Sequence, residues 1–223
     1  MSEALWFPIS LTLRACGASC LLFALVAVPL AYLCARRQSA ATRVLMFVCT
    51  LPLIFPPVAL GYLLLLVFGI HGPLGAPLDA WLDVRIIFSQ TAVCMAAFIA
   101  GLPLVLRPVK IAFESEELRE LESAAHVCGA GALRAFLTVT LPTVRNAVLA
   151  ALLLGVARAS GEVGITMMIG GNVADRTNTL SLEIFNAVGR GDFETASFLC
   201  VILAAIALVL YLALEALRRR APL

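Results

Sequence analysis

Charged residues are scarce in this sequence. Aspartate, glutamate, lysine and arginine together make up 13% of its 223 residues, whereas hydrophobic residues make up 62%. A soluble domain usually has about a quarter of its residues charged, and a chain this apolar could not cover itself with polar surface. The composition therefore excludes an ordinary soluble protein and predicts a single membrane domain over residues 1–223.

Positive charge is also limited. The net charge is +2, and the chain has one lysine against fifteen arginines. Binding to nucleic acid depends on neutralising many phosphates with lysine and arginine. We therefore expect no nucleic-acid partner.

Histidine and paired cysteine, the usual metal ligands, are nearly missing. The two histidines lie in different loops, and none of the seven cysteines forms a CxxC pair. Neither a zinc site nor a disulfide framework is therefore expected. We predict no metal bound by this chain, and we expect the cysteines to pack as small apolar side chains.

The sequence also lacks the motifs of nucleotide binding and hydrolysis. It contains no GxxxxGK[ST] pattern, so it does not bind ATP by that route. It contains neither GxSxG nor HExxH, and both histidines lie outside the apolar runs. We predict no catalytic residue and no cofactor on this chain.

What the sequence does have is apolar length. Five runs are long enough to cross a bilayer as helices, which takes about 20 residues. The first is too long for a signal peptide and is predicted to be a retained span. Because the bilayer core forces the backbone to satisfy itself, we predict an all-α integral membrane fold with about five to six transmembrane helices. The five runs cover residues 10–35, 43–69, 86–107, 143–169 and 194–216.

The second run contains Pro52, Pro56 and Pro57. Proline removes a backbone donor and kinks a helix. A kink of this kind can border a transport pathway or can serve helix packing alone, and the sequence leaves both readings open.

Eleven of the sixteen lysine and arginine residues fall on one side of this topology. Basic residues concentrate in cytoplasmic loops. This side is therefore predicted to be cytoplasmic, with the N-terminus outside and the C-terminus inside. The eleven are Arg36, Arg37, Arg43, Arg107, Lys110, Arg119, Arg134, Arg145, Arg218, Arg219 and Arg220.

One long polar stretch, Glu114 to Pro142, interrupts the apolar chain. Ser115 is placed to cap a helix whose first turn holds Glu116 and Glu117, where the helix dipole favours acids. Helical spacing predicts an apolar stripe, a glycine break and a second segment leading into the fourth run. We predict a cytoplasmic docking loop at about 108–142, and a helix lying on the membrane is the alternative. The stripe is Leu118, Leu121, Ala125 and Cys128, the glycines are Gly129 and Gly131, and the second segment is Leu133–Leu141.

Arg158 and Glu162 are charges inside the fourth run. At positions i and i+4 they can pair on one helix face, and charges within spans usually face a bundle interior or a cavity. A lining for an oxyanion pathway and a structural ion pair are both compatible with this spacing. Gly155 and Gly161 are expected to let a neighbouring helix approach closely, and a short helix is predicted at Thr179–Val188.

The docking loop resembles the EAA loop of ABC importer permeases. Ser123-Ala124-Ala125 is followed after three residues by Gly129, and after nine more by Val139-Thr140-Leu141-Pro142. The family pattern is E-A-A, three residues, G, nine residues and I-x-L-P. This sequence departs from the pattern at one position, where Ser123 stands at the glutamate position, one residue after Glu122. The resemblance implies an ATPase-docking coupling loop formed by Glu122, Ser123, Ala124, Ala125, Gly129, Val139, Leu141 and Pro142.

Two further stretches resemble molybdate permeases of the ModB type. The segment LPLIFPPVALGY at 51–62 is similar to their second span, and RASGEVG at 158–164 is similar to their R-A-x-G-E-F-G segment. The run at 167–172 together with Asp192-Phe193 resembles tungstate permeases. The likeness covers about residues 10–215 and implies that the translocation pathway includes Arg158, Gly161, Glu162 and Asn172.

The resemblance implies the type I ABC importer permease fold in a bacterial cytoplasmic (inner) membrane, carrying molybdate or tungstate. The implied partners are a second copy of the chain, two ABC ATPase subunits that hold ATP and Mg, an extracytoplasmic oxyanion-binding protein and the lipid bilayer. A sulfate-type permease and a non-transporting sensor or scaffold that recruits a cytoplasmic partner are the alternatives. A passive channel lacks support because the sequence has no charged ring or filter motif.

Overall fold

The computed structural model describes residues 2–37 and 39–219, and these residues form helices joined by short turns without a β-strand. Four stretches in this described part are long and apolar enough to cross a membrane. The predicted all-α membrane fold is confirmed. The four stretches are Trp6–Arg36, Gln90–Glu114, Ala132–Ser160 and Phe193–Ala213.

Two of these stretches are joined from shorter elements, and each of these two contains a five-residue π-helical segment. The first stretch lies in α1 (Ser2–Leu22), η1 (Phe23–Ala27) and α2 (Val28–Arg36), and the second is α6 (Gln90–Glu114). The third consists of α8 (Ala132–Ala135), η2 (Phe136–Thr140) and α9 (Leu141–Ser160), and the fourth lies in α12 (Phe193–Arg219). Of the basic residues predicted to face the cytoplasm, Arg220 lies outside the described residues.

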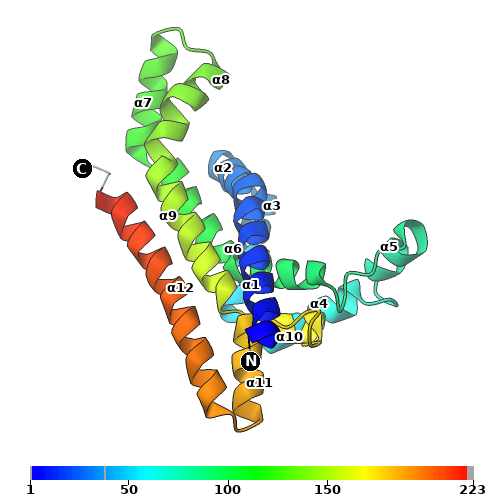
Figure 1. The fold of residues 1–223 in the computed structure, drawn as a ribbon. Helices are drawn as coiled ribbons and strands as arrows, with labels where there is room; N and C mark the ends of the chain where they lie inside the picture. The colour runs from blue at the N-terminus through cyan, green and yellow to red at the C-terminus, as the bar shows by residue number, and fades with distance from the viewer. Residues whose placement is uncertain (1, 38, 220–223) are drawn as a thin grey trace.

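The second apolar run is not one helix but two, α3 (Ala40–Ile54) and α4 (Pro57–Phe68). Phe55 is extended, with φ −83° and ψ 142°, because a residue that precedes proline is pushed out of the helical region. Pro56 and Pro57 also lack the N–H groups that would continue the helix. After this break, α4 and the short α5 (Gly75–Leu82) extend to one side of the bundle (Figure 1).

The fourth run also ends earlier than predicted. The helix α9 ends at Ser160 rather than near residue 169, and a separate short helix, α10 (Gly164–Gly170), follows. The short helix predicted at Thr179–Val188 is confirmed as α11 (Leu180–Gly189), with Thr179 Oγ1 accepting a hydrogen bond from the Leu182 N–H at 3.3 Å. This is the usual role of threonine at the start of a helix.

The helix α6 forms the centre of the bundle, in contact with α1, α2, α3, α9 and α10. Its closest neighbour is α9: a Cβ at Gly101 would lie 2.5 Å from the Gly155 carbonyl oxygen. The predicted close approach at Gly155 is therefore confirmed. The same prediction for Gly161 is wrong, because nothing lies within 4 Å of a Cβ at that position.

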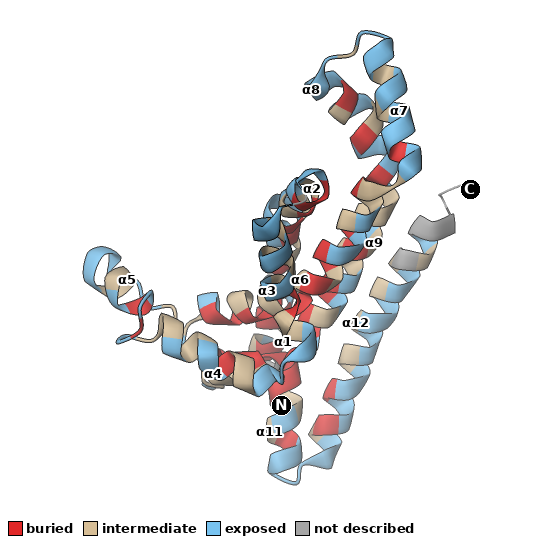
Figure 2. Cartoon of the chain, turned by 180° about the vertical axis from the view of Figure 1, so that it is seen from behind, coloured by how far each residue is buried: buried red, intermediate tan, exposed pale blue. Residues whose placement is uncertain are grey.

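The two ends of the molecule differ (Figure 1). The helix α7 (Glu116–Val127) and α8 project from one end, and the last turns of α12 reach the same end. The N-terminus and the turn between α11 and α12 lie at the other end. In Figure 2, α12 is mostly exposed, and Val201 and Val209 on it are each more than 60% exposed. An apolar surface of this extent indicates contact with lipid or with another chain.

Candidate functional site

The projecting helix α7 keeps the charged character that the sequence predicted. Glu116 and Glu117 occupy its first turn, and Leu118 is fully buried. The predicted side-chain cap is wrong: Ser115 stands at the capping position, but its hydroxyl donates to the Ala112 carbonyl at 3.0 Å. Leu121 and Cys128 of the predicted stripe are exposed. The helix α7 therefore contacts the rest of the protein mainly through the buried Leu118 in its first turn and at one further point.

That further point is the carboxylate of Glu122. Its Oε1 atom accepts hydrogen bonds from the Arg36 guanidinium at the end of α2 and from the Thr140 hydroxyl in η2. The Glu122 side chain is only 15% exposed. One carboxylate therefore joins three segments that are far apart in the sequence.

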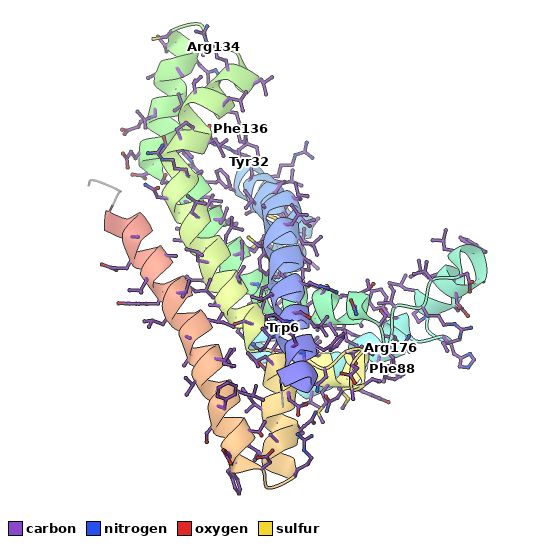
Figure 3. All side chains as sticks on the ribbon, viewed as in Figure 1. Trp6, Tyr32, Phe88, Arg134, Phe136 and Arg176 are labelled. Carbon is purple, nitrogen blue, oxygen red and sulfur yellow. The ribbon has the colours of Figure 1, made fainter. Side chains whose placement is uncertain are left out.

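Aromatic rings extend the same junction. The Arg36 guanidinium lies 5.2 Å from the centre of the Tyr32 ring, within the range of a cation–π contact. Tyr32 in turn meets Phe113 of α6 at 5.1 Å and Phe136 of η2 at 5.2 Å, both edge to face, and Figure 3 places Tyr32 and Phe136 together beneath the α7–α8 end. We call Tyr32, Arg36, Phe113, Glu122, Phe136 and Thr140 the Tyr32 junction.

The electrostatics of the Tyr32 junction favour an ionised Glu122. Burial acts to raise the pKa of this carboxyl, but the hydrogen bonds from Arg36 and Thr140 and the positive charge of Arg36 outweigh it. The net result is a pKa below the ordinary value of 4.5. Glu122 is therefore a carboxylate at neutral pH, and the ion pair with Arg36 is intact.

The turn after α7 exposes an apolar tip. Gly129 has φ +82°, a conformation that favours glycine, and the Ala130 N–H donates to the Ala125 carbonyl at 3.0 Å to close the helix end. Val127 and Leu133 beside this turn are 89% and 73% exposed. The predicted glycine break is confirmed at Gly129, and the tip is a surface that another protein can contact.

The residues predicted for ATPase docking divide into two places. Ser123, Ala124 and Gly129 are exposed on α7 and its turn, and Ala125 is half-buried there. The Ser123 hydroxyl donates to the Arg119 carbonyl of its own helix at 2.8 Å. Glu122 points inward to the Tyr32 junction, whereas the remaining three lie farther along the chain, around the start of α9. These three are Val139, Leu141 and Pro142.

Arg158 and Glu162 do form the predicted ion pair, with 2.8 Å between Nη2 and Oε2. They do not share a helix face, because α9 ends at Ser160 and Glu162 lies in the turn beyond it. The other carboxylate oxygen of Glu162, Oε1, accepts the Ile165 N–H at 2.7 Å. This second contact caps the start of α10, a role that the spacing alone did not reveal.

The α9–α10 turn is anchored on both sides. Glu162 is 3% exposed, and a Cβ at Gly164 would lie 2.7 Å from Cβ of Pro57 in α4. The Ser160 carbonyl, freed where α9 ends, accepts a hydrogen bond from the Ser181 hydroxyl of α11 at 2.9 Å. The pair of charges therefore lies where α4, α9, α10 and α11 come together.

Asn172 belongs to a different group. Its Nδ2 donates to Asn186 Oδ1 at 2.6 Å, and Asn186 Nδ2 reaches Glu183 Oε2 at 3.4 Å. Glu183 also pairs with Arg190 at 2.6 Å. The side-chain hydrogen bonds of Asn172 are thus made with α11 and not with the Arg158–Glu162 pair. Sequence reasoning missed Glu183 and Asn186, although their spacing of three on the short α11 was a usable signal.

Known proteins match this chain along nearly its whole length. The molybdenum transport system permease protein ModB of Haemophilus influenzae is 34% identical over 213 residues, which cover 95% of this chain and 93% of the relative. The protein of the same name from Escherichia coli K12 is 31% identical over 220 residues, 98% of this chain and 96% of the relative.

A sulfate transport system permease protein, CysW of Synechocystis, is 33% identical over 205 residues, but this match covers 88% of the chain and 74% of the relative. Residues 27–221 match the family described as binding-protein-dependent transport system inner membrane component. That range includes the Tyr32 junction, the α7 helix and the Arg158–Glu162 pair. The chain therefore belongs to the family of binding-protein-dependent transport system inner membrane components.

Proposed function

We propose that this chain is the membrane permease subunit of an ATP-driven importer for molybdate. The observation that carries the proposal is the similarity to molybdenum permeases from end to end, at 31–34% identity. Tungstate is the second candidate substrate, because it is a tetrahedral dianion of the same class. Sulfate is a weaker candidate, because the sulfate relative matches over less of its own length.

The proposed partners occupy the two ends of the molecule. A separate ATPase subunit binds the exposed tip of α7 and α8, where Val127 and Leu133 offer apolar contacts. This end faces the cytoplasm, as does the C-terminus, and the N-terminal end faces the binding protein outside. Two copies of the chain assemble with two ATPase subunits, and no catalytic residue, cofactor or metal is expected on this chain.

The Tyr32 junction gives the proposed coupling its physical basis. A displacement of α7 by the ATPase is carried by Glu122 to Arg36 in α2, and by Phe136 and Tyr32 toward α6. Coupling of this kind needs contiguous packed and hydrogen-bonded groups. The junction supplies them between the projecting helix and three spans.

The substrate passes, in this proposal, near Arg158. Its side chain is 30% exposed while its partner Glu162 is almost fully buried, so the positive member of the pair is the accessible one. An accessible arginine at membrane depth suits attraction of an oxyanion. Gly161 lies in the turn between the two charges, and Asn172 contributes to the polar lining farther along the pathway.

Reconstitution tests this function directly. The full chain is placed in liposomes with its partner ATPase and binding protein, and ATP hydrolysis and uptake are measured with molybdate, tungstate and sulfate. We expect molybdate to stimulate hydrolysis and to accumulate. Stimulation by sulfate alone would reassign the substrate. An absence of stimulation by all three, with the complex assembled, would favour a sensor or scaffold that recruits a cytoplasmic partner.

A further inference from the structure

A cavity of about 730 Å³ opens between α2, α3 and α6, close to where α6 leads into α7. Its volume falls in the range of about 300–1,000 Å³ that small-molecule sites occupy. The Tyr32 junction lies outside its lining, and so do Arg158 and Glu162. Its lining residues are Cys34, Thr42, Arg43, Met46, Arg107, Lys110, Ile111 and Glu114.

Positive charge dominates this cavity. Arg43, Arg107 and Lys110 line it against the single acid Glu114. Lys110 and Glu114 pair with each other at 2.6 Å, which leaves the two guanidinium groups. Among the residues that the structure describes, neither Arg43 nor Arg107 forms an ion pair.

One of these two arginines is positioned by a buried group. Arg107 Nε donates to Thr50 Oγ1 at 3.3 Å, and the Thr50 hydroxyl donates to the Met46 carbonyl at 2.6 Å. Thr50 is 4% exposed. This hydrogen bond holds the Arg107 side chain at the wall of the cavity. The remaining N–H groups of Arg107 have the fork geometry that suits oxyanions.

The start of α3 adds to the positive field. Thr42 lies in its first turn, in a capping box with Ser39, and it also lines the cavity. The N-terminal end of a helix carries partial positive charge and exposed N–H groups, and it favours anions. Two unpaired guanidinium groups and this helix end thus border one hollow.

We propose that this cavity binds a tetrahedral oxyanion group at the cytoplasmic surface of the membrane. The group comes either from the phosphate of an anionic phospholipid or from a free oxyanion released by transport. Basic pockets between membrane helices on the cytoplasmic side are known to hold anionic headgroups. The cytoplasmic position of the cavity rests on the orientation proposed above, and the free-oxyanion source depends in addition on the proposed transport function.

Equilibrium titrations of the purified full chain distinguish the sources. The probes are dioctanoyl phosphatidylglycerol, the neutral dioctanoyl phosphatidylcholine, sodium phosphate and sodium molybdate, each followed by calorimetry. The test variant is R43Q/R107Q. The control is R37Q/R145Q, which removes the same charge from arginines that do not line the cavity. Circular dichroism and gel filtration verify that both variants are folded.

We expect the affinity of one anionic probe to fall about 25-fold in R43Q/R107Q, at about fivefold per charge removed, and to change less than twofold in the control. Loss confined to phosphatidylglycerol identifies the lipid, and loss with phosphate or molybdate identifies the free oxyanion. An equal loss in both variants, or no loss in either, overturns the proposal.

A second variant reverses the sign of the effect. Glu114→Gln removes the only acid in the cavity and frees Lys110, so the same probe should bind several-fold more tightly. Weaker binding would contradict the electrostatic basis. None of these titrations needs an ATPase or transport, so their failure leaves the transport function standing. Failure of molybdate-stimulated hydrolysis likewise leaves the lipid arm intact.

Discussion

Glu122 is the residue on which the attachment of α7 depends most, because its carboxylate joins Arg36 and Thr140 at a site that is 15% exposed. Replacing it by glutamine keeps an acceptor for Thr140 but removes the charge that pairs with Arg36. We expect E122Q to lower the free energy of unfolding by about 1 kcal/mol, since the pair is only partly buried, and to reduce molybdate-stimulated ATP hydrolysis several-fold.

The matched control for that substitution is E120Q, the same change at an exposed position of the same helix. It should leave both thermal unfolding and coupled hydrolysis unchanged. If E120Q reduces coupled hydrolysis as much as E122Q does, the negative charge of α7 matters for docking rather than for the Tyr32 junction.

The pH dependence of the Arg36–Glu122 pair has a definite sign. Because the folded pKa of Glu122 lies below its ordinary value of 4.5, the stabilisation is fully present above that value and is lost as the pH falls through the folded pKa. The difference in melting temperature between the wild type and E122Q should therefore be constant from about pH 6 to 8. It should shrink below pH 4.5; a difference that grows on acidification would contradict the assignment.

At the scale of elements, the turn between α9 and α10 depends on a cap as well as on an ion pair. Glu162 binds Arg158 with one carboxylate oxygen and the Ile165 N–H with the other. We expect E162A to destabilise the protein by about 1–3 kcal/mol, because it leaves a buried N–H without an acceptor. E162Q retains an amide oxygen and should cost clearly less in thermal unfolding measurements.

The same reasoning predicts that the reciprocal swap R158E/E162R does not restore function. Arginine has no acceptor, so it cannot cap α10 even if the two charges pair again. Wild-type molybdate uptake by the swapped variant would show that the ion pair alone matters.

The crossing of α6 and α9 is another element-scale constraint. A Cβ at Gly101 would meet the Gly155 carbonyl oxygen and the Phe23 ring, both at 2.5 Å, so Gly101→Ala should lower the free energy of unfolding by about 1–3 kcal/mol. Gly17→Ala is the control: it also lies in a helix, but nothing is within 4 Å of its Cβ. Alanine there should be neutral or slightly stabilising. Equal effects would mean that the crossing tolerates a wider separation.

Local sequence patterns predicted much of this architecture, and the features that were not predicted depend on contacts between distant residues or on where a helix ends. Apolar length predicted the four long spans, a short helix was predicted where α11 lies, and Gly129 predicted the end of α7, because each depends on neighbouring residues. The partners of Glu122 lie 86 and 18 positions away, and no local spacing encodes such contacts. The cap formed by Glu162 was missed for a different reason, since it depends on α9 ending at Ser160 instead of continuing.

At the scale of the whole molecule, the projecting tip of α7 and α8 and the exposed face of α12 are both apolar, but we expect them to contact different partners. Val127 and Leu133 are 89% and 73% exposed on either side of the turn that follows the charged helix α7. Val127 lies outside the four long apolar stretches, and Leu133 is only the second residue of the third one, Ala132–Ser160. The long apolar face of α12 lies within a span and needs no protein partner to explain it. The tip therefore predicts a soluble partner.

This distinction gives the last prediction. V127E/L133E should abolish copurification of the ATPase subunit, because it places two charges in the centre of the proposed contact. The melting temperature of the isolated chain should stay within about 1 °C of the wild-type value, because both side chains are solvent-exposed. The control W81Q alters a side chain that is 84% exposed on α5, away from α7 (Figure 1), and should leave copurification intact. An ATPase that still binds V127E/L133E would have to dock elsewhere, and the Tyr32 junction could not then be its route into the spans.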